Sequence, residues 1–196
     1  MPNDVKKSIP SSESLYLLHP YNSCLVTSIG ANGKPNVMAA AWIIPVSVSP
    51  PMIAMSIRPE RHSHKLILET GEFVVNIPTF EMVNEVFVCG RTSGRDIDKF
   101  QEAKLFLKKA EKLKPPIIDD CVAHLECKVV KTMEVGDHTL VVGEIVAAYA
   151  VEGCFDLVYD VQKFKPCLHV GKNYFTTWIG KCKEPKMRKC EDLKVL

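Results

Sequence analysis

NVMAAAWIIPVSVSPPMIAMSIR, residues 36–58, is the stretch that decides the fold of this chain. It predicts two extended segments joined across Pro50-Pro51, because short apolar runs bounded by turn residues are typical of strands. The first segment is rich in small residues, which let a flat ring lie against the backbone, and it carries the aromatic face of Trp42. The second ends in Ser56 and Arg58, whose side chains are donors suited to a phosphate. The stretch therefore suits an aromatic, phosphorylated cofactor, and it is equally typical of buried core strands.

The composition is that of an ordinary soluble globular protein of one domain. The chain has 196 residues, of which 46% are hydrophobic and 24% are charged, so disorder is excluded for most of it. A net charge of +2 gives no argument for a nucleic-acid partner. The longest uncharged stretch, residues 35–57, contains four prolines, which is wrong for a membrane helix. The N-terminus has no apolar core of a secretory signal, and we expect a cytoplasmic protein without a membrane association.

Eight cysteines are present, but no CxxC pair occurs among them, which speaks against zinc, iron–sulfur and thioredoxin-type sites. We expect no metal, and we interpret most of the thiols as small buried hydrophobes in a reducing compartment. Cys182 and Cys190 lie in a polar tail and are expected to be exposed. Residues 181–196 hold six Lys or Arg and three Asp or Glu, so this end is basic and is interpreted as a solvated surface segment.

Strand patterns dominate both halves of the chain. In the first half they cover residues 23–29, 37–42, 52–57 and 73–77, with Asn32-Gly33 as a hairpin signal. In the second half they cover 122–133 and 138–150, joined by the turn 134–137. Short helices are predicted over 64–69, capped by Ser63 and ended by Gly71, and over 80–88. Residues 101–113 have a helical composition that Pro115-Pro116 stops. The pattern predicts a mainly β fold, a closed barrel with peripheral helices.

Several segments, in this order and spacing, resemble the flavin reductase-like, FMN-binding split-barrel family, most closely flavoredoxins and archaeal FMN-binding proteins. They are NVMAAAWIIPVSVSPP, SIRPERHSHKLI, GEFVVNIP, CGRTSGRDIDKF, CVAHLECKV, VGDHTLVVGEIV and KPCLHVGKNYF. The resemblance implies a Greek-key-like split barrel, a homodimer, and FMN held non-covalently near the subunit interface. It also implies a domain over residues 15–178, an N-terminal extension over 1–14 and a basic tail over 179–196.

The resemblance implies roles for residues around the cofactor. The phosphate is expected near Ser56, Arg58 and Ser63, and Asn36 is expected to donate to the flavin or its ribityl chain. The isoalloxazine ring is expected against three groups: Ala41, Trp42 and the backbone of Val46 and Ser47. Without the resemblance, the residues favour another interpretation, in which Arg58 is an exposed charge at a strand end and Ser63 is only a helix cap.

The resemblance also implies roles for three further residues. Lys99 resembles a flavin-contacting lysine, and a cation beside the pyrimidine ring would stabilise the anionic reduced flavin. The resemblance places His138 on the side from which nicotinamide approaches, and His169 in a segment that borders the flavin. The alternatives are a surface lysine and a solvated turn histidine.

No Ser/His/Asp or Cys/His set suggests protein-based covalent catalysis, and a bound flavin would need none. The main hypothesis is an FMN-binding redox protein that accepts electrons from NADH or NADPH and passes them to an acceptor. Because no Rossmann or Walker pattern occurs, a nicotinamide would bind without a dinucleotide fold. The first alternative is a flavoredoxin-type carrier reduced by a partner protein. The second is a flavin-free binding module.

Overall fold

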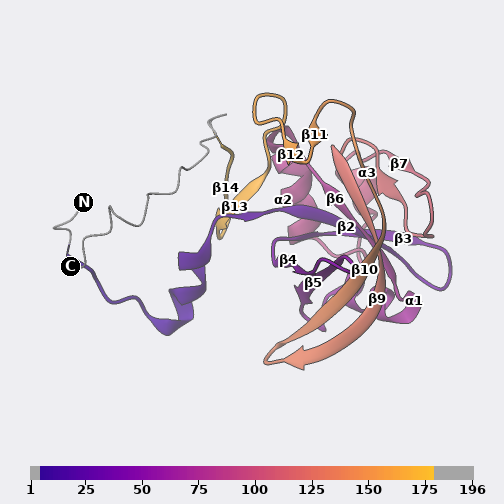
Figure 1. Cartoon of the computed structure of the whole chain (residues 1–196). Coiled ribbons are helices and arrows are strands. Elements are labelled where there is room, and N and C mark those ends of the chain that lie inside the picture. The colour runs from indigo at the N-terminus through magenta and orange to yellow at the C-terminus, as the bar shows by residue number, and fades with distance from the viewer. Residues whose placement is uncertain (1–4, 179–196) are drawn as a thin grey trace.

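The computed structural model describes residues 5–178, and its main feature is one antiparallel sheet of seven strands (Figure 1). The order of the strands is β3-β2-β6-β9-β10-β5-β4. Their bounds are β2 Cys24–Ile29, β3 Pro35–Ala40, β4 Ile43–Ser47, β5 Met52–Ile57, β6 Glu72–Ile77, β9 Ala123–Val135 and β10 His138–Ala150.

Two residues connect the opposite edges of this sheet. Strands β3 and β4 are its first and last strands, yet only Ala41 and Trp42 lie between them in the sequence. A flat sheet would separate these strands by about 29 Å, at roughly 4.8 Å per strand, whereas the link spans at most about 11 Å. The sheet must therefore curl until its edges meet at this link. The backbone N–H of Ser56 donates to the carbonyl of Trp42 at 3.0 Å, which continues the pairing of β4 with β5 into the link. The result is a barrel with a seam between β3 and β4.

Side chains alternate between the two faces of each strand, so the sheet contributes to two separate hydrophobic cores. Val26 and Met38 face the interior of the barrel, where they join Met55, Phe73 and other buried side chains. Their neighbours Leu25 and Val37 face outward and pack against helix α2 (Val83–Arg91). Strands buried on both faces read as nearly continuous apolar runs, which explains the sequence of β2.

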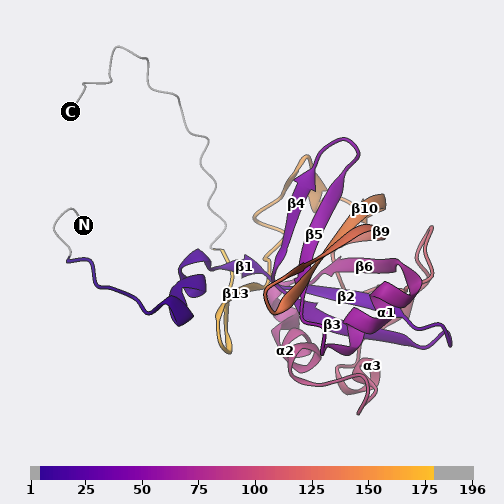
Figure 2. The same ribbon diagram turned by 90° about the horizontal axis from the view of Figure 1, so that it is seen from below.

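Helices lie around the barrel (Figure 2). Helix α1 (His62–Thr70) inserts Ile67 into the barrel core and ends at Gly71, whose φ of 70° suits glycine. The 3-10 helix η2 (Phe80–Met82) precedes α2, and α3 (Lys99–Glu102) is a single turn. The remaining strands of the described chain form three small sheets. One contains β1 (Tyr21–Asn22), β13 (Leu168–Gly171) and β14 (Tyr174–Thr176). The second pairs β7 (Leu107–Lys108) with β8 (Ile117–Ile118), and the third pairs β11 (Phe155–Asp156) with β12 (Val158–Tyr159).

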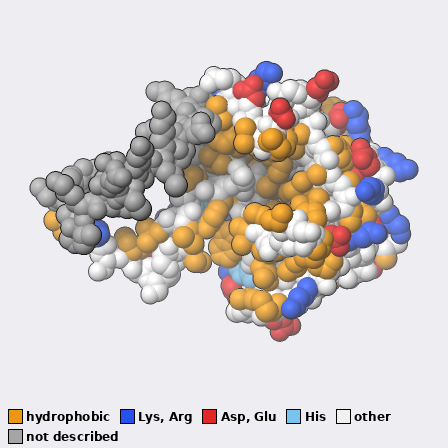
Figure 3. All heavy atoms as spheres, in the orientation of Figure 1, with side chains coloured by type: hydrophobic (Ala, Val, Ile, Leu, Met, Phe, Trp, Pro, Cys, Tyr) orange, Lys and Arg blue, Asp and Glu red, His pale blue; other side chains and the backbone are white. Residues whose placement is uncertain are grey.

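The N-terminal 3-10 helix η1 (Ser11–Leu18) stands away from the barrel in both ribbon views and contains no buried residue (Figures 1 and 2). The domain start that we expected at residue 15 falls inside it. On the face drawn in Figure 3, hydrophobic side chains gather over the middle and charged ones lie mainly toward the rim. No helix among residues 5–178 is long and apolar enough to span a membrane.

The mainly β architecture and the predicted strands are confirmed, including the long hairpin whose turn has Gly136 at a φ of 59°. The cap was wrong: α1 begins at His62, and Ser63 is its second residue, only 2% exposed. Strand β4 was not predicted as a separate strand. The helix over 80–88 is found as η2 followed by α2, which runs through Gly90 to Arg91.

The helix suggested by the composition of residues 101–113 was also wrong. Helical structure ends at Glu102, and the segment that follows is held by the buried carboxylate of Glu126. This carboxylate accepts hydrogen bonds from the backbone N–H groups of Glu111, Lys112 and Leu113 at 2.7–2.9 Å. The three N–H groups thus find partners outside a helix, and tertiary contacts override local propensity.

Most thiols behave as expected from the sequence. Of the six cysteines that the structure describes, five are buried, Cys154 is partly exposed, and all six are free. Burial raises the pKa of the Cys127 thiol to about 12, which keeps it protonated. Cys182, Cys190 and the expected tail over 179–196 lie outside the described residues.

Candidate functional site

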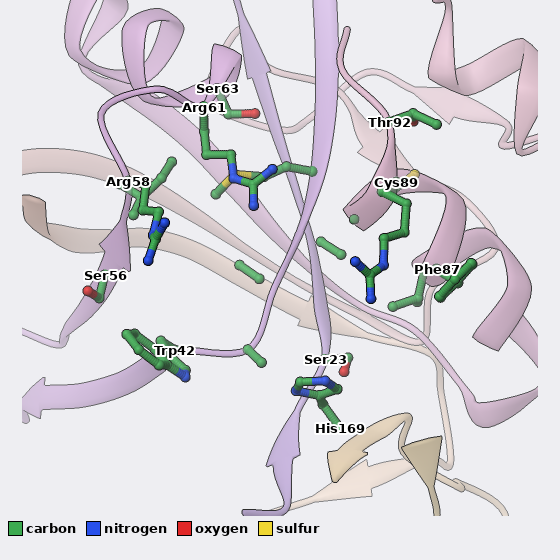
Figure 4. Close-up of a pocket in the computed structure, with 18 of the residues that line it drawn as sticks. Ser23, Trp42, Ser56, Arg58, Arg61, Ser63, Phe87, Cys89, Thr92 and His169 are labelled. Atoms are coloured by element: carbon green, nitrogen blue, oxygen red, sulfur yellow. The ribbon is translucent and has the colours of Figure 1, made fainter. Parts of the chain in front are cut away.

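A cavity of about 680 Å³ opens beside the seam, between the β3–β4 link, the end of β5 and helices α1 and α2 (Figure 4). Its lining includes seven of the residues expected from the sequence to contact a cofactor. They are Ala41, Trp42, Ser56, Arg58, Ser63, Lys99 and His169. His138 also lines it. The fold thus assembles residues from distant parts of the chain in one place.

One side of the cavity is suited to an anion. Figure 4 shows Arg58, Arg61 and Ser63 on this side, around the first turn of α1. No side chain caps this helix, and the N–H of His64 donates to the carbonyl of Arg61 at 3.1 Å. The N–H groups of His62 and Ser63 remain available, and a helix N-terminus favours negative charge. The Ser63 hydroxyl accepts a hydrogen bond from Asn36 at 2.7 Å, which leaves its own O–H to donate. A phosphate would find hydroxyl, amide and guanidinium donors together.

Asn36 itself does not line the cavity. It is 5% exposed on β3, and its amide is directed at Ser63. The structure therefore places it behind the side that is suited to an anion, where it orients the serine.

The C-terminal end of β5 and the turn of the long hairpin supply a second group of contacts. The guanidinium of Arg58 donates to Asp137 at 2.8 Å, and Asp137 lies 2.7 Å from Nδ1 of His138. The His138 ring stacks on Trp42, with centroids 5.1 Å apart and an interplanar angle of 30°. Trp42 is 38% exposed, so it retains surface for a planar ligand.

Lys99 brings a buried positive charge to the cavity. It is 5% exposed, and its ammonium donates to the carbonyl oxygens of Val37 at 2.9 Å and Cys89 at 2.8 Å. Burial lowers the pKa of this ammonium, and it forms no ion pair with a carboxylate of the described chain. Since an ammonium has three donors, one remains for a ligand.

His169 closes another side of the cavity, together with His19 and Phe175. Its Nε2 donates to the carbonyl of Lys172 at 3.1 Å, and its own carbonyl is bonded to Nδ1 of His19 at 3.0 Å. These bonds fix the ring beside that of Phe175, 5.3 Å away.

Besides Asn36, two more expected residues are not brought to the cavity. Val46 and Ser47 lie on β4, and neither belongs to its lining. The Val46 side chain is 48% exposed. After Trp42 the chain runs along the outer edge of β5, so only the start of this segment faces the cavity.

Sequence reasoning missed several cationic and aromatic residues of the lining. The guanidinium of Arg91 lies 5.5 Å above the Phe87 ring, and Arg95 donates to the carbonyl of Glu60 at 2.9 Å. Charged lining residues comprise four arginines, two lysines and one glutamate: Arg58, Arg61, Arg91, Arg95, Lys99, Lys172 and Glu60. The signal was the arginine pairs within RPER and GRTSGR, whose convergence becomes visible only in the fold.

Comparisons with known proteins identify the family of this chain. The model of the flavin reductase like domain family matches residues 16–168. An Archaeoglobus fulgidus protein of unassigned function is 42% identical over 163 residues, which cover 83% of this chain and 91% of its own. Flavoredoxin from Methanosarcina acetivorans is similar in structure, with a TM-score of 0.79 and 29% identity over 96% of this chain and 98% of its own.

An FMN-binding protein from Thermus thermophilus, solved with bound p-hydroxybenzaldehyde, has a TM-score of 0.77 and 27% identity over 93% of this chain and 98% of its own. The split-barrel fold expected from the resemblance is confirmed. A family match over most of the chain, joined to a barrel with a pocket lined by arginine and lysine at its seam, leads to one conclusion: the protein belongs to the flavin reductase-like domain family.

Proposed function

We propose that this protein binds FMN non-covalently and transfers electrons through it, with NADH or NADPH as the electron donor. One observation supports the proposal above all. The uncapped N-terminus of α1, which is suited to an anion, and the partly exposed ring of Trp42 line the same cavity. The family of the chain and its likeness to an FMN-binding protein support the choice of flavin.

The residues present fit FMN. Ser63, Arg58 and Arg61 would hold the phosphate, while Trp42 and the small side chain of Ala41 would border the ring. Lys99 would place a positive charge beside the ring, where it favours the reduced anionic form. When bound, FMN supplies the redox chemistry, and the chain binds it, orients it and limits its access to water.

The excess of positive charge supports an anionic electron donor. A flavin phosphate would balance about two charges, and the lining has six cationic residues and one acidic one. The remaining cations suit the phosphates of a nicotinamide dinucleotide, which would enter from the open side. Small carbonyl compounds are candidate acceptors, since the Thermus protein binds an aldehyde.

A flavoredoxin-type electron carrier is the second candidate, favoured by the likeness to the Methanosarcina flavoredoxin. In that case a protein partner would replace the nicotinamide as donor. A flavin-free binding module is the third candidate, and it would purify colourless.

We also propose that the protein is a homodimer. Exposed apolar side chains lie on β4, in the turn that follows it and on the end of the β9–β10 hairpin. They include Ile44, Val46, Val48, Met133 and Val135, which are 48–93% exposed. Surface of this kind is typical of subunit interfaces. Sedimentation analysis at micromolar concentration would test this proposal, and a monomer would contradict it.

The function is tested by an absorption spectrum of the purified protein, recorded anaerobically before and after NADH and then NADPH. Yellow protein that bleaches supports the nicotinamide-dependent reductase. Yellow protein that stays oxidised supports the carrier. Colourless protein that takes up no added FMN overturns the proposal.

A further inference from the structure

The turn between β9 and β10 carries a carboxylate that two pocket residues share. One oxygen of Asp137 lies 2.7 Å from Nδ1 of His138, and the other lies 2.8 Å from the guanidinium of Arg58. Both partners line the cavity, whereas Asp137 does not. Asp137 thus positions both the guanidinium of Arg58 and the imidazole of His138.

Strand register produces this arrangement. Thr139 pairs with Ile57 and Leu140 pairs with Ser56, so the next step brings His138 to the end of β5, beside Arg58. His138 also pairs with Val135 across the tight turn, where Gly136 has a φ of 59°. Because both pairings are fixed by the sheet, Asp137 is held in position by backbone hydrogen bonds.

The shared carboxylate determines which nitrogen of His138 carries the proton. The hydrogen bond from His138, and then the charge of Arg58, hold the pKa of Asp137 below its usual range. An ionised carboxylate can only accept, so Nδ1 of His138 must donate. Nε2 makes no hydrogen bond to any residue that the structure describes, and the ring stacks on Trp42 in the cavity. Nε2 is therefore the nitrogen that can exchange a proton with a bound molecule.

We propose that His138 exchanges a proton with the acceptor in this pocket through Nε2, and that Asp137 is its positioning residue. The inference rests on the proposed function, because a bound flavin is needed to supply the electrons. It names the class of acceptor: an organic compound, such as a quinone, that takes up two protons with two electrons.

The balance of the step is simple. Reduction of a quinone to a hydroquinone consumes two electrons and two protons. A bound, reduced FMN would supply both electrons and one proton. The second proton would come from water through His138. Nε2 first takes up a proton while Nδ1–H stays bonded to Asp137, and the imidazolium then gives the Nε2 proton to the quinone oxygen and returns to the Nδ1–H form. Asp137 is neither oxidised nor protonated, and its work is to keep the ring in one tautomer and orientation.

The first test uses the ligand-free protein. Nitrogen NMR of ¹⁵N-histidine-labelled protein reports the tautomer of each ring, and His138→Gln identifies the resonance of His138. We expect the Nδ1–H form in the wild type and a change toward Nε2–H in Asp137→Ala. Asp119→Ala is the matched control, because Asp119 is also an exposed partner in an ion pair, with Lys108 at 2.7 Å, and it does not line the cavity. An unchanged tautomer in Asp137→Ala would overturn the inference.

The second test uses the FMN-loaded, reduced protein and two acceptors. Menadione is a quinone, whereas ferricyanide takes up one electron and no proton. Reoxidation by menadione should slow at least about tenfold in Asp137→Ala and His138→Gln, within the range of general acid catalysis. Reoxidation by ferricyanide should stay within about twofold, and Asp119→Ala should match the wild type with both. Equal slowing with both acceptors, or none, would contradict the assignment.

The two proposals fail in different ways. An FMN fluorescence titration precedes the kinetics, and a protein that does not bind FMN overturns the proposed function together with this inference. Intact FMN binding with unchanged menadione kinetics in Asp137→Ala overturns the inference alone. Because Asp137 is exposed in a turn, we expect the variant to melt at the wild-type temperature.

Discussion

The side-chain amide of Asn36 donates a 2.7 Å hydrogen bond to the hydroxyl of Ser63, and so ties β3 to the first turn of α1. Both residues are at least 95% buried. The bond orients the serine toward the anion-binding side of the cavity without exposing the asparagine. We therefore expect Asn36 to affect ligand binding only through Ser63.

A substitution at Gly94 should disturb this hydrogen bond. A Cβ atom added at Gly94 would overlap Oδ1 of Asn36, so Gly94→Ala should push the asparagine away from Ser63. We expect FMN affinity to fall about tenfold and the free energy of unfolding to fall by about 1–3 kcal/mol, the cost of unpaired buried groups. FMN fluorescence quenching and urea denaturation measure the two effects.

Gly90→Ala is the matched control. Gly90 lies within α2, and a Cβ there would make only an ordinary contact with Ala39 at 3.4 Å. Alanine is the better helix former, so stability should stay equal or rise by up to about 1 kcal/mol. Equal FMN affinity in both variants would show that the Asn36–Ser63 bond does not serve the ligand.

Arg58→Ala should weaken FMN binding by about 1.5–3 kcal/mol, which is roughly ten- to hundredfold in the dissociation constant, because a charged hydrogen-bond donor to the phosphate is lost. Lys108→Ala removes an exposed cation from a similar ion pair outside the cavity and should have no effect on binding. Titration calorimetry with FMN checks both variants. Unchanged affinity in Arg58→Ala would remove Arg58 from the site.

Lys99→Met should lower the midpoint potential of bound FMN. The buried ammonium favours the anionic reduced flavin, and each 1.4 kcal/mol of lost stabilisation corresponds to about 30 mV for a two-electron couple. Lys128→Met, on the exposed face of β9, should retain the wild-type potential. Spectroelectrochemical titration measures the midpoint potentials. Equal potentials in the wild type and in Lys99→Met would place Lys99 away from the flavin ring.

Acidification should destabilise the protein through His124. Burial lowers the pKa of this imidazole in the folded state, while its Nδ1 lies 2.9 Å from Oδ1 of Asn76. The unfolded chain binds a proton near pH 6.5, so below this pH it takes up a proton that the folded state resists, and the free energy of unfolding falls.

The measurement for His124 is urea denaturation at pH 7.5 and 5.5. His124→Gln should lose less stability over this range than the wild type, since its side chain cannot be protonated. An equal loss in both proteins would show that other groups cause the acid sensitivity.

Most of the strands and the long hairpin were accessible from the sequence because alternation and turn residues are local signals. The Gly136 turn and the two strands around it are an example. The expectation that Trp42, Ser56 and Arg58 contact one ligand came from the family resemblance together with residue chemistry.

The remaining features depend on contacts that no local pattern records. Asp137 reads as an ordinary turn residue until the register of β10 and β5 brings it to Arg58. Residues 111–113 read as helical until a buried glutamate from β9 takes their N–H groups. Val46 lies in the same apolar run as Trp42, but only the barrel seam shows that the chain has left the cavity between them.

The two-residue link between β3 and β4 also affects the energetics of folding. The cavity is lined by both sides of the seam, so FMN would meet all its contacts only in the closed barrel. A ligand that binds only the closed form adds its binding free energy to closure, about 2.7 kcal/mol at a concentration one hundred times its dissociation constant. The cofactor would then act as a clasp, and its loss would loosen the sheet first along the edge that Ala41 and Trp42 join.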